Sequence, residues 1–153
     1  MSLSLKTINV SFTDNLENQF AVELFKYLKK KCKVSVAKDY YSTIDITITD
    51  RKDTSNRVFL ELKSRKDTYK NFPTFLIGYK KMLNIRDKKL NPSILIWKFS
   101  NCLYFCDYKE QFCHFKTKVI QNSSVVEINK CICSEGIEPL VKHILILLNL
   151  NGE

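Results

Sequence analysis

The stretches Thr43-Ile-Asp-Ile-Thr-Ile-Thr49 and Arg57-Val-Phe-Leu-Glu-Leu-Lys63 decide the fold. Successive side chains of a β-strand point to opposite faces, so the isoleucines of the first stretch share one face and Asp45 takes the other. In the second stretch the aliphatic residues share one face, which leaves Phe59, Glu61 and Lys63 on the opposite one. If the two strands pair, two carboxylates and an ammonium group converge on one side of a sheet.

The surrounding sequence predicts helices and strands in alternation, which is the pattern of an α/β fold. A helix is expected over 14–31, because apolar residues recur there at helical spacing, and a second helix is expected to begin at Pro73 and end near Ile85. The predicted strands cover 33–37, 43–49, 57–63, 93–99, 103–108, 112–117 and 125–128, and a last helix covers 136–149. The first three strands should form a meander within a mixed sheet flanked by helices.

The length of 153 residues fits one domain, with a core over about 14–99 and a C-terminal extension over about 100–150. The net charge of +9 favours polyanions such as nucleic acid or acidic lipid surfaces. Eighteen of the 25 basic residues but seven of the 16 acids lie between Lys26 and Lys89. The run Lys29-Lys30-Lys31 has a second explanation, since cations are favoured at the end of a helix.

The sequence shows no secretory signal at its start and no apolar run of the roughly 20 residues that a membrane span needs. We therefore expect an intracellular protein without a membrane partner. In that setting the cysteines should be reduced and behave as small apolar residues. Zinc binding by the C-terminal cysteines and His114 is the alternative, although their spacing is unlike that of structural zinc sites. Three glycines also exclude a glycine-rich phosphate-binding loop.

Asp45, Glu61 and Lys63 have the chemistry that phosphodiester hydrolysis needs. Carboxylate oxygens are the ligands that Mg²⁺ prefers, and the ion makes its bound water more acidic. Lys63 can position or help deprotonate the attacking water, or stabilise negative charge on the phosphate. A Glu-x-Lys on an exposed strand face also occurs by chance, so this short motif alone has low specificity.

The combination of Asp45 with Glu61-Leu62-Lys63, after a helix and within a meander, resembles the PD-(D/E)XK nuclease superfamily. Ile44 stands where that family usually has proline. The resemblance implies a restriction-endonuclease-like core, a bound Mg²⁺ or Mn²⁺, and a further acidic ligand from the first helix. Glu17 and Glu23 are candidates for that ligand, and Glu17 is preferred because it shares a helix face with the apolar residues.

The segments Leu16-Glu17-Asn-Gln-Phe-Ala-Val-Glu-Leu24 and Phe59-Leu-Glu-Leu-Lys-Ser-Arg-Lys-Asp67 are similar to those of Holliday-junction resolvases. The resemblance covers about 14–99. It implies catalytic residues Glu17, Asp45, Glu61 and Lys63, with the three acids as metal ligands. Residues expected to contact nucleic-acid phosphates are Ser64, Arg65, Lys66, Lys80 and Lys81.

The sequence thus predicts a metal-dependent DNA endonuclease, with branched or junction DNA as the finer expectation. A twofold junction would call for a homodimer, to which the apolar C-terminal helix could contribute, unless it folds back onto its own sheet. Two alternatives stay open. One is a nucleic-acid-binding or assembly module that keeps the fold without cutting, and the other is an RNA nuclease with the same metal chemistry.

Overall fold

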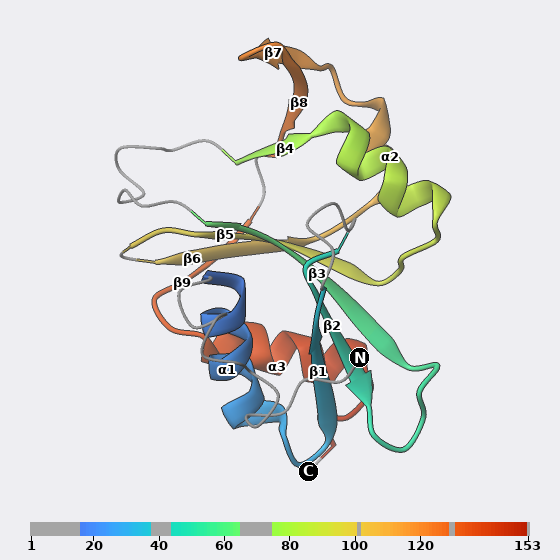
Figure 1. Cartoon of the computed structure of the whole chain (residues 1–153), viewed down its shortest axis with the longest axis vertical. Helices are drawn as coiled ribbons and strands as arrows, with labels where there is room; N and C mark the ends of the chain where they lie inside the picture. Colours follow the sequence, from blue (N-terminus) through green and yellow to red (C-terminus); the bar gives the residue numbers. More distant parts are fainter. Residues whose placement is uncertain (1–15, 38–43, 65–74, 101, 129–130, 153) are drawn as a thin grey trace.

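The computed structural model describes residues 16–37, 44–64, 75–100, 102–128 and 131–152. These described residues form two sheets, three α-helices and one 3₁₀ helix (Figure 1). Their bounds, in chain order, are α1 Leu16–Leu28, β1 Cys32–Val36, β2 Ile46–Asp50, β3 Arg57–Ser64, β4 Leu76–Gly78, α2 Tyr79–Asp87, β5 Ser93–Lys98, β6 Leu103–Asp107, η3 Glu110–His114, β7 Lys118–Ile120, β8 Ser123–Glu127, β9 Ile132–Ser134 and α3 Glu138–Leu147.

The larger sheet has the strand order β1-β2-β3-β5-β6-β9. The first three strands form an antiparallel meander, with Ile46 opposite Leu60. β3 and β5 are parallel, with Glu61 opposite Leu95, and the remaining pairs are antiparallel. A parallel pair needs a long crossover, which here includes α2. The predicted mixed sheet flanked by helices is therefore confirmed.

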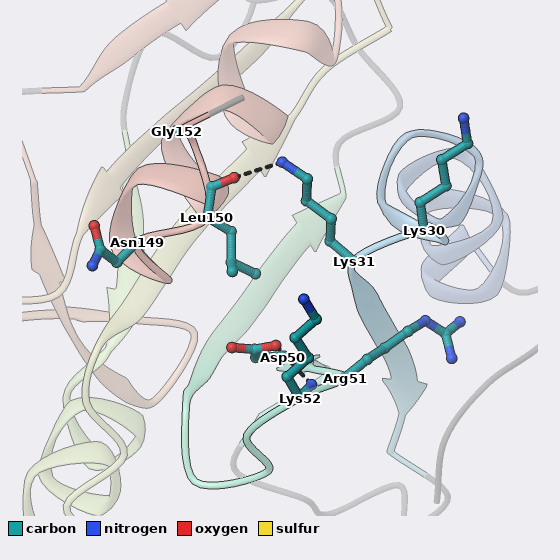
Figure 2. Close-up of a pocket in the computed structure, with 8 residues that line it drawn as sticks. All are labelled: Lys30, Lys31, Asp50, Arg51, Lys52, Asn149, Leu150 and Gly152. Atoms are coloured by element: carbon teal, nitrogen blue, oxygen red, sulfur yellow. Dashed lines mark hydrogen bonds between the residues drawn. The ribbon is translucent and has the colours of Figure 1, made fainter.

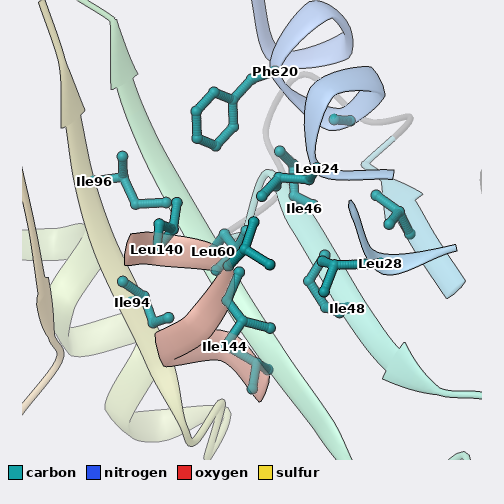
Figure 3. Close-up of a cluster of buried hydrophobic side chains, with 14 of the residues drawn as sticks. Phe20, Leu24, Leu28, Ile46, Ile48, Leu60, Ile94, Ile96, Leu140 and Ile144 are labelled. Carbon is teal, nitrogen blue, oxygen red and sulfur yellow. The ribbon is translucent and has the colours of Figure 1, made fainter. Parts of the chain in front are cut away.

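The helices α1 and α3 cover one face of this sheet (Figure 1). The face is apolar because β2, β3 and β5 each turn alternate aliphatic residues toward the helices (Figure 3). Leu24 of α1, Leu60 of β3 and Ile144 of α3 have no exposed side-chain surface. Burying each such side chain stabilises the fold by roughly 1.5–3 kcal/mol. The C-terminal helix therefore folds back onto its own sheet through its buried residues.

The opposite face is covered by α2 and the smaller sheet, whose order is β4-β8-β7 (Figure 1). A second apolar cluster fills this layer, with Trp97 of β5 and Met82 of α2 both fully buried. The indole N–H of Trp97 donates a hydrogen bond to the backbone oxygen of Leu76, 3.0 Å away. This bond satisfies the polar atom of a buried aromatic residue and ties β4 to the larger sheet.

One predicted helix is present but begins later than expected, and one predicted strand is replaced by a helical turn. The second helix begins at Tyr79, and the residues just before it form β4, because Ile77 pairs with Val126 and is buried. Pro73 itself lies outside the described residues. The strand expected over 112–117 is replaced by η3, in which the adjacent residues Phe112 and Cys113 are both buried. Neighbouring buried residues fit a helical turn, since a strand would send them to opposite faces.

The other predicted helices and strands are found with shifts of a few residues at their ends, and the short strands β4, β7 and β9 were not predicted. The six cysteines are free thiols; Cys32 and Cys113 are buried, and Cys133 is exposed. Among the described residues, no helix is long and apolar enough to cross a bilayer.

Candidate functional site

Glu61 is the centre of the candidate site. The aliphatic neighbours of Glu61 in β3, Leu60 and Leu62, face α1 and α3, so Glu61 points to the other side of the sheet. Its side chain is nevertheless only 2% exposed. Lys63 follows two positions later, and its Nζ lies 3.2 Å from Oε2 of Glu61. Strand alternation has thus placed the Glu-x-Lys pair together, as the sequence predicted.

Asp45 lies just before β2 and is bound to both neighbouring strands. Its backbone N–H donates to the oxygen of Leu60 at 3.1 Å, and its backbone oxygen accepts from Ala37 at 2.8 Å. The backbone N–H of Leu62 donates to Oδ2 of the Asp45 side chain at 2.7 Å. These bonds hold the Asp45 carboxylate beside the strand that carries Glu61.

Glu17 reaches the same place from the first turn of α1, where the helix dipole favours an acid. Partial burial raises the pKa of Glu17, and the nearby Asp45 carboxylate raises it further. The ammonium groups of Lys81 and Lys63 act in the opposite direction. Glu17 is therefore in electrostatic contact with Asp45, Lys63 and Lys81, although it is at least 28 positions away from them in the sequence.

A second lysine completes the group. Lys81 of α2 places Nζ 3.4 Å from Oε1 of Glu61, so two ammonium groups flank one carboxylate. Its neighbour Lys80 is exposed, because successive helical residues point in different directions. Ser64 is exposed at the end of β3. Arg65 and Lys66 lie outside the described residues.

The environment of Glu61 makes its charge costly. Burial raises its pKa, the Asp45 carboxylate adds to this, and Lys63 and Lys81 oppose it, with a result of about 7 against an ordinary value of 4.5. Oε1 is also buried and makes no hydrogen bond to any described residue, although the Lys81 ammonium lies 3.4 Å from it. A buried carboxylate oxygen that lacks a hydrogen bond would be stabilised by a further cationic partner.

The donor chemistry fits a hard divalent cation. Within the described residues Oε1 of Glu61 lacks a hydrogen bond, one oxygen of Asp45 is held by Leu62, and Glu17 is close enough to Asp45 for the two charges to interact. The described residues contain no group of three or more His, Cys, Asp or Glu side chains already spaced to hold a metal ion. The acids therefore suit Mg²⁺ in kind, and they would need to adjust their positions to hold it.

One contact between a histidine and an aspartate was not predicted from the sequence. His143 of α3 places Nε2 2.6 Å from Oδ1 of Asp107 at the end of β6. The two residues are 36 positions apart, and nothing in their local sequence indicates the contact. This pair lies beside a different pocket, lined also by Phe115 and Ile132, and does not contribute to the acid group around Glu61.

No family model matches the chain, and no curated protein matches it. Among solved structures, the chain is similar to Hjc, a Holliday junction resolvase from the archaeal hyperthermophile Archaeoglobus fulgidus. The TM-score is 0.42 and the identity 11%, and the match covers 72% of this chain and 86% of that one. At these values the likeness assigns no role to any residue, so the function must be argued from the side chains themselves.

Proposed function

We propose that this chain is a metal-dependent nuclease of the PD-(D/E)XK type, acting on DNA. The observation that carries the proposal is the buried Glu61 carboxylate, flanked by Lys63 and Lys81 and close to the carboxylate of Asp45, which in turn interacts with Glu17. Burying such a carboxylate is unfavourable for folding, so a structural role is a poor explanation for it. Strongly shifted pKa values of this kind are concentrated at functional sites.

In the proposed site, Glu61, Asp45 and Glu17 would hold Mg²⁺ or Mn²⁺. Such an ion, when bound, lowers the pKa of its water and neutralises charge on the phosphate. The Lys63 side chain is 30% exposed and so reaches both Glu61 and solvent. From there its ammonium group can donate hydrogen bonds to the attacking water or to a phosphate oxygen. Ser64, Arg65, Lys66 and Lys80 would contact the nucleic-acid backbone.

Branched DNA is the finer part of the proposal, and it rests on the resolvase-like segments around Glu17 and Glu61. A twofold junction calls for two copies of the active site, so the proposed working form is a homodimer. The buried face of α3 is already used within the chain. The dimer contact would therefore have to come from another surface.

The test is cleavage of labelled linear duplex, single-stranded DNA, four-way-junction DNA and RNA with Mg²⁺ or Mn²⁺. We expect cleavage by the wild type, a loss of at least about a hundredfold in Lys63→Ala and Asp45→Ala, and a small change in Lys116→Ala, at an exposed lysine outside the proposed site. Circular dichroism would show that each variant is folded. Preferred cleavage of RNA would identify RNA instead of DNA as the substrate. Nucleic-acid binding without cleavage in either metal would favour the non-catalytic binding module.

A further inference from the structure

A second cationic group lies beyond the C-terminal end of α1, the helix whose first turn carries Glu17. A pocket of about 330 Å³ is lined by the end of α1, the turn after β2 and the segment after α3 (Figure 2). Its charged lining residues are Lys30, Lys31, Asp50, Arg51 and Lys52. Four cations and one acid therefore surround a space of the size needed for a phosphate group and its waters.

The single acid offsets only one of the four positive charges. Asp50 is 7% exposed, its Oδ1 accepts from the backbone N–H of Lys52 at 2.8 Å, and its Oδ2 accepts from Asn56 at 3.2 Å. Both oxygens are thus used to fix the turn after β2. Within the part of the chain that the structure describes, none of the four cations forms an ion pair.

Two of the cations are held in place by backbone oxygens. Nζ of Lys31 donates to the oxygen of Leu150 at 2.8 Å, and Nε of Arg51 donates to the oxygen of Lys29 at 2.8 Å (Figure 2 draws the first of these). Using Nε in this way leaves the two terminal nitrogens of the guanidinium for an anion. A fixed cation loses less conformational entropy on binding than a mobile one.

The helix dipole explains only half of this group. It favours Lys30 and Lys31 at the end of α1. It does not explain Arg51 and Lys52, which come from a different element and are brought there by the pairing of β1 with β2. Two elements thus contribute basic residues to the lining of one pocket, and such a lining suits an anion.

The pocket is distant from the acid group around Glu61. Glu17 lies at the start of α1 and Lys30 just after its end, and 13 helical residues span about 20 Å. Asp45 likewise precedes β2 and Arg51 follows it, and the five residues of β2 span about 17 Å. Along a duplex this separation corresponds to roughly five or six base pairs.

We propose that Lys30, Lys31, Arg51 and Lys52 form a phosphate-binding site for the backbone of a nucleic acid, separate from the acid group. This site binds the sugar-phosphate chain without reading its sequence, because all four side chains are donors suited to phosphate oxygens. It goes beyond the proposed nuclease activity, since it would also operate in a protein that binds without cutting.

The experiment measures binding of a fluorescent 20-base-pair duplex by anisotropy in EDTA, where no cleavage occurs, over a series of salt concentrations. The double variant Arg51→Gln/Lys52→Gln removes two exposed cations of the pocket. The matched control Lys116→Gln/Lys142→Gln removes two exposed lysines elsewhere and makes the same change in net charge. Thermal melts would confirm that both variants fold.

We expect the dissociation constant of the pocket variant to rise about tenfold at 100 mM salt. Its salt slope should fall by nearly one unit for each phosphate that the variant no longer neutralises. The control should change the dissociation constant by less than about threefold. Equal losses of affinity in both variants would reduce the effect to overall charge and overturn the proposal. An unchanged affinity of the pocket variant would overturn it as well.

A second arm distinguishes a nucleic acid from free phosphate. Inorganic phosphate is titrated into ¹⁵N-labelled protein, and the amide shifts of Arg51 and Lys52 are followed. Weak shifts at millimolar phosphate, together with the loss of duplex affinity in the pocket variant, support the proposal. Tight, saturable phosphate binding with unchanged duplex affinity in the variant would assign the pocket to a small anion instead. Because none of these measurements needs cleavage, an inactive protein would leave the result interpretable.

Discussion

Nζ of Lys81 lies 3.4 Å from Oε1 of Glu61, whereas Lys63 lies beside the other oxygen of the same carboxylate. The crossover helix thus supplies a second cation to an acid of β3. Each ammonium group makes the ionised form of Glu61 less unfavourable, against the larger effect of burial. The proposed site therefore depends on α2 as well as on the strands that carry its motif.

Replacing Lys81 by methionine should raise the pKa of Glu61 further, because one of the two stabilising cations is removed. If ionised Glu61 is needed for catalysis, the activity of Lys81→Met should fall about tenfold at pH 7 and recover toward pH 9. The pH profile of cleavage is the measurement. Lys116→Met is the matched control, since Lys116 is exposed and lies outside the proposed site. A loss of activity that is the same at every pH would contradict this role.

Glu61 should also make the folded protein less stable as the pH rises. Its pKa is about 7 in the folded state and 4.5 ordinarily, so between these values the folded state holds a proton that the unfolded state has released. Stability from this group is complete below pH 4.5 and is lost as the pH rises through 7. The change is on the order of 3 kcal/mol.

The comparison that isolates this effect is wild type against Glu61→Gln, measured by urea unfolding from pH 4.5 to 8. The variant has no carboxyl to titrate, so its free energy of unfolding should increase relative to that of the wild type as the pH rises. Glu110→Gln, on an exposed position of η3, serves as the control. A difference between wild type and Glu61→Gln that stays constant with pH would exclude the shifted pKa.

Metal binding should show the opposite pH dependence. A divalent cation binds the ionised carboxylate, so it must displace the proton that Glu61 holds near neutral pH. We expect the affinity for Mn²⁺ to rise about tenfold between pH 6 and pH 8, with protons released into the buffer. Calorimetry in two buffers of different ionisation enthalpy measures both quantities. Affinity that does not depend on pH, or that survives in Asp45→Ala/Glu61→Gln, would place the metal elsewhere.

Much of this arrangement could be predicted from periodicity. The alternation of Ile46 and Ile48 against Asp45, and of Leu60 and Leu62 against Glu61, identified the apolar face and the strands that carry the site. Local spacing could not choose between Lys80 and Lys81. That choice depends on the phase of α2, and the predicted start at Pro73 gave the wrong helix boundary.

The parts that were missed depend on pairing between distant segments. Arg51 and Lys52 are about twenty positions from Lys30 in sequence, and the register that sets Cys32 opposite Asp50 brings the two pairs together. Similarly, β9 joins the larger sheet through three residues opposite β6, a segment too short for periodicity to identify. Pairing of this kind is a property of the folded chain, so composition and local pattern give little indication of it.

The packing between the larger sheet and its helices offers a stability test that does not depend on function. Leu60 is fully buried between β3 and the helices α1 and α3. Leu60→Ala should lower the free energy of unfolding by about 2–5 kcal/mol, through reduced burial and the cavity left behind. Ile132→Ala, at a side chain that is 53% exposed, should cost less than about 1 kcal/mol. Similar losses of stability in the two variants would contradict the layered packing.

The thiols at the edge of the larger sheet provide the last prediction. The thiol of Cys106 hydrogen-bonds to the sulfur of Cys131, and this contact lowers the pKa of Cys131 while it raises that of Cys106. Because the thiolate is the reactive form, Cys131 should be alkylated by iodoacetamide at a lower pH than an ordinary cysteine. In Cys106→Ala the hydrogen-bond donor is removed, so the alkylation rate of Cys131 at pH 7 should fall several-fold. Cys106→Ser retains a donor, so the alkylation rate of Cys131 should stay close to that of the wild type. Peptide mass spectrometry measures these alkylation rates, with Cys133 as the internal reference. Equal alkylation rates of Cys131 in the alanine variant and the wild type would show that Cys106 does not stabilise the Cys131 thiolate.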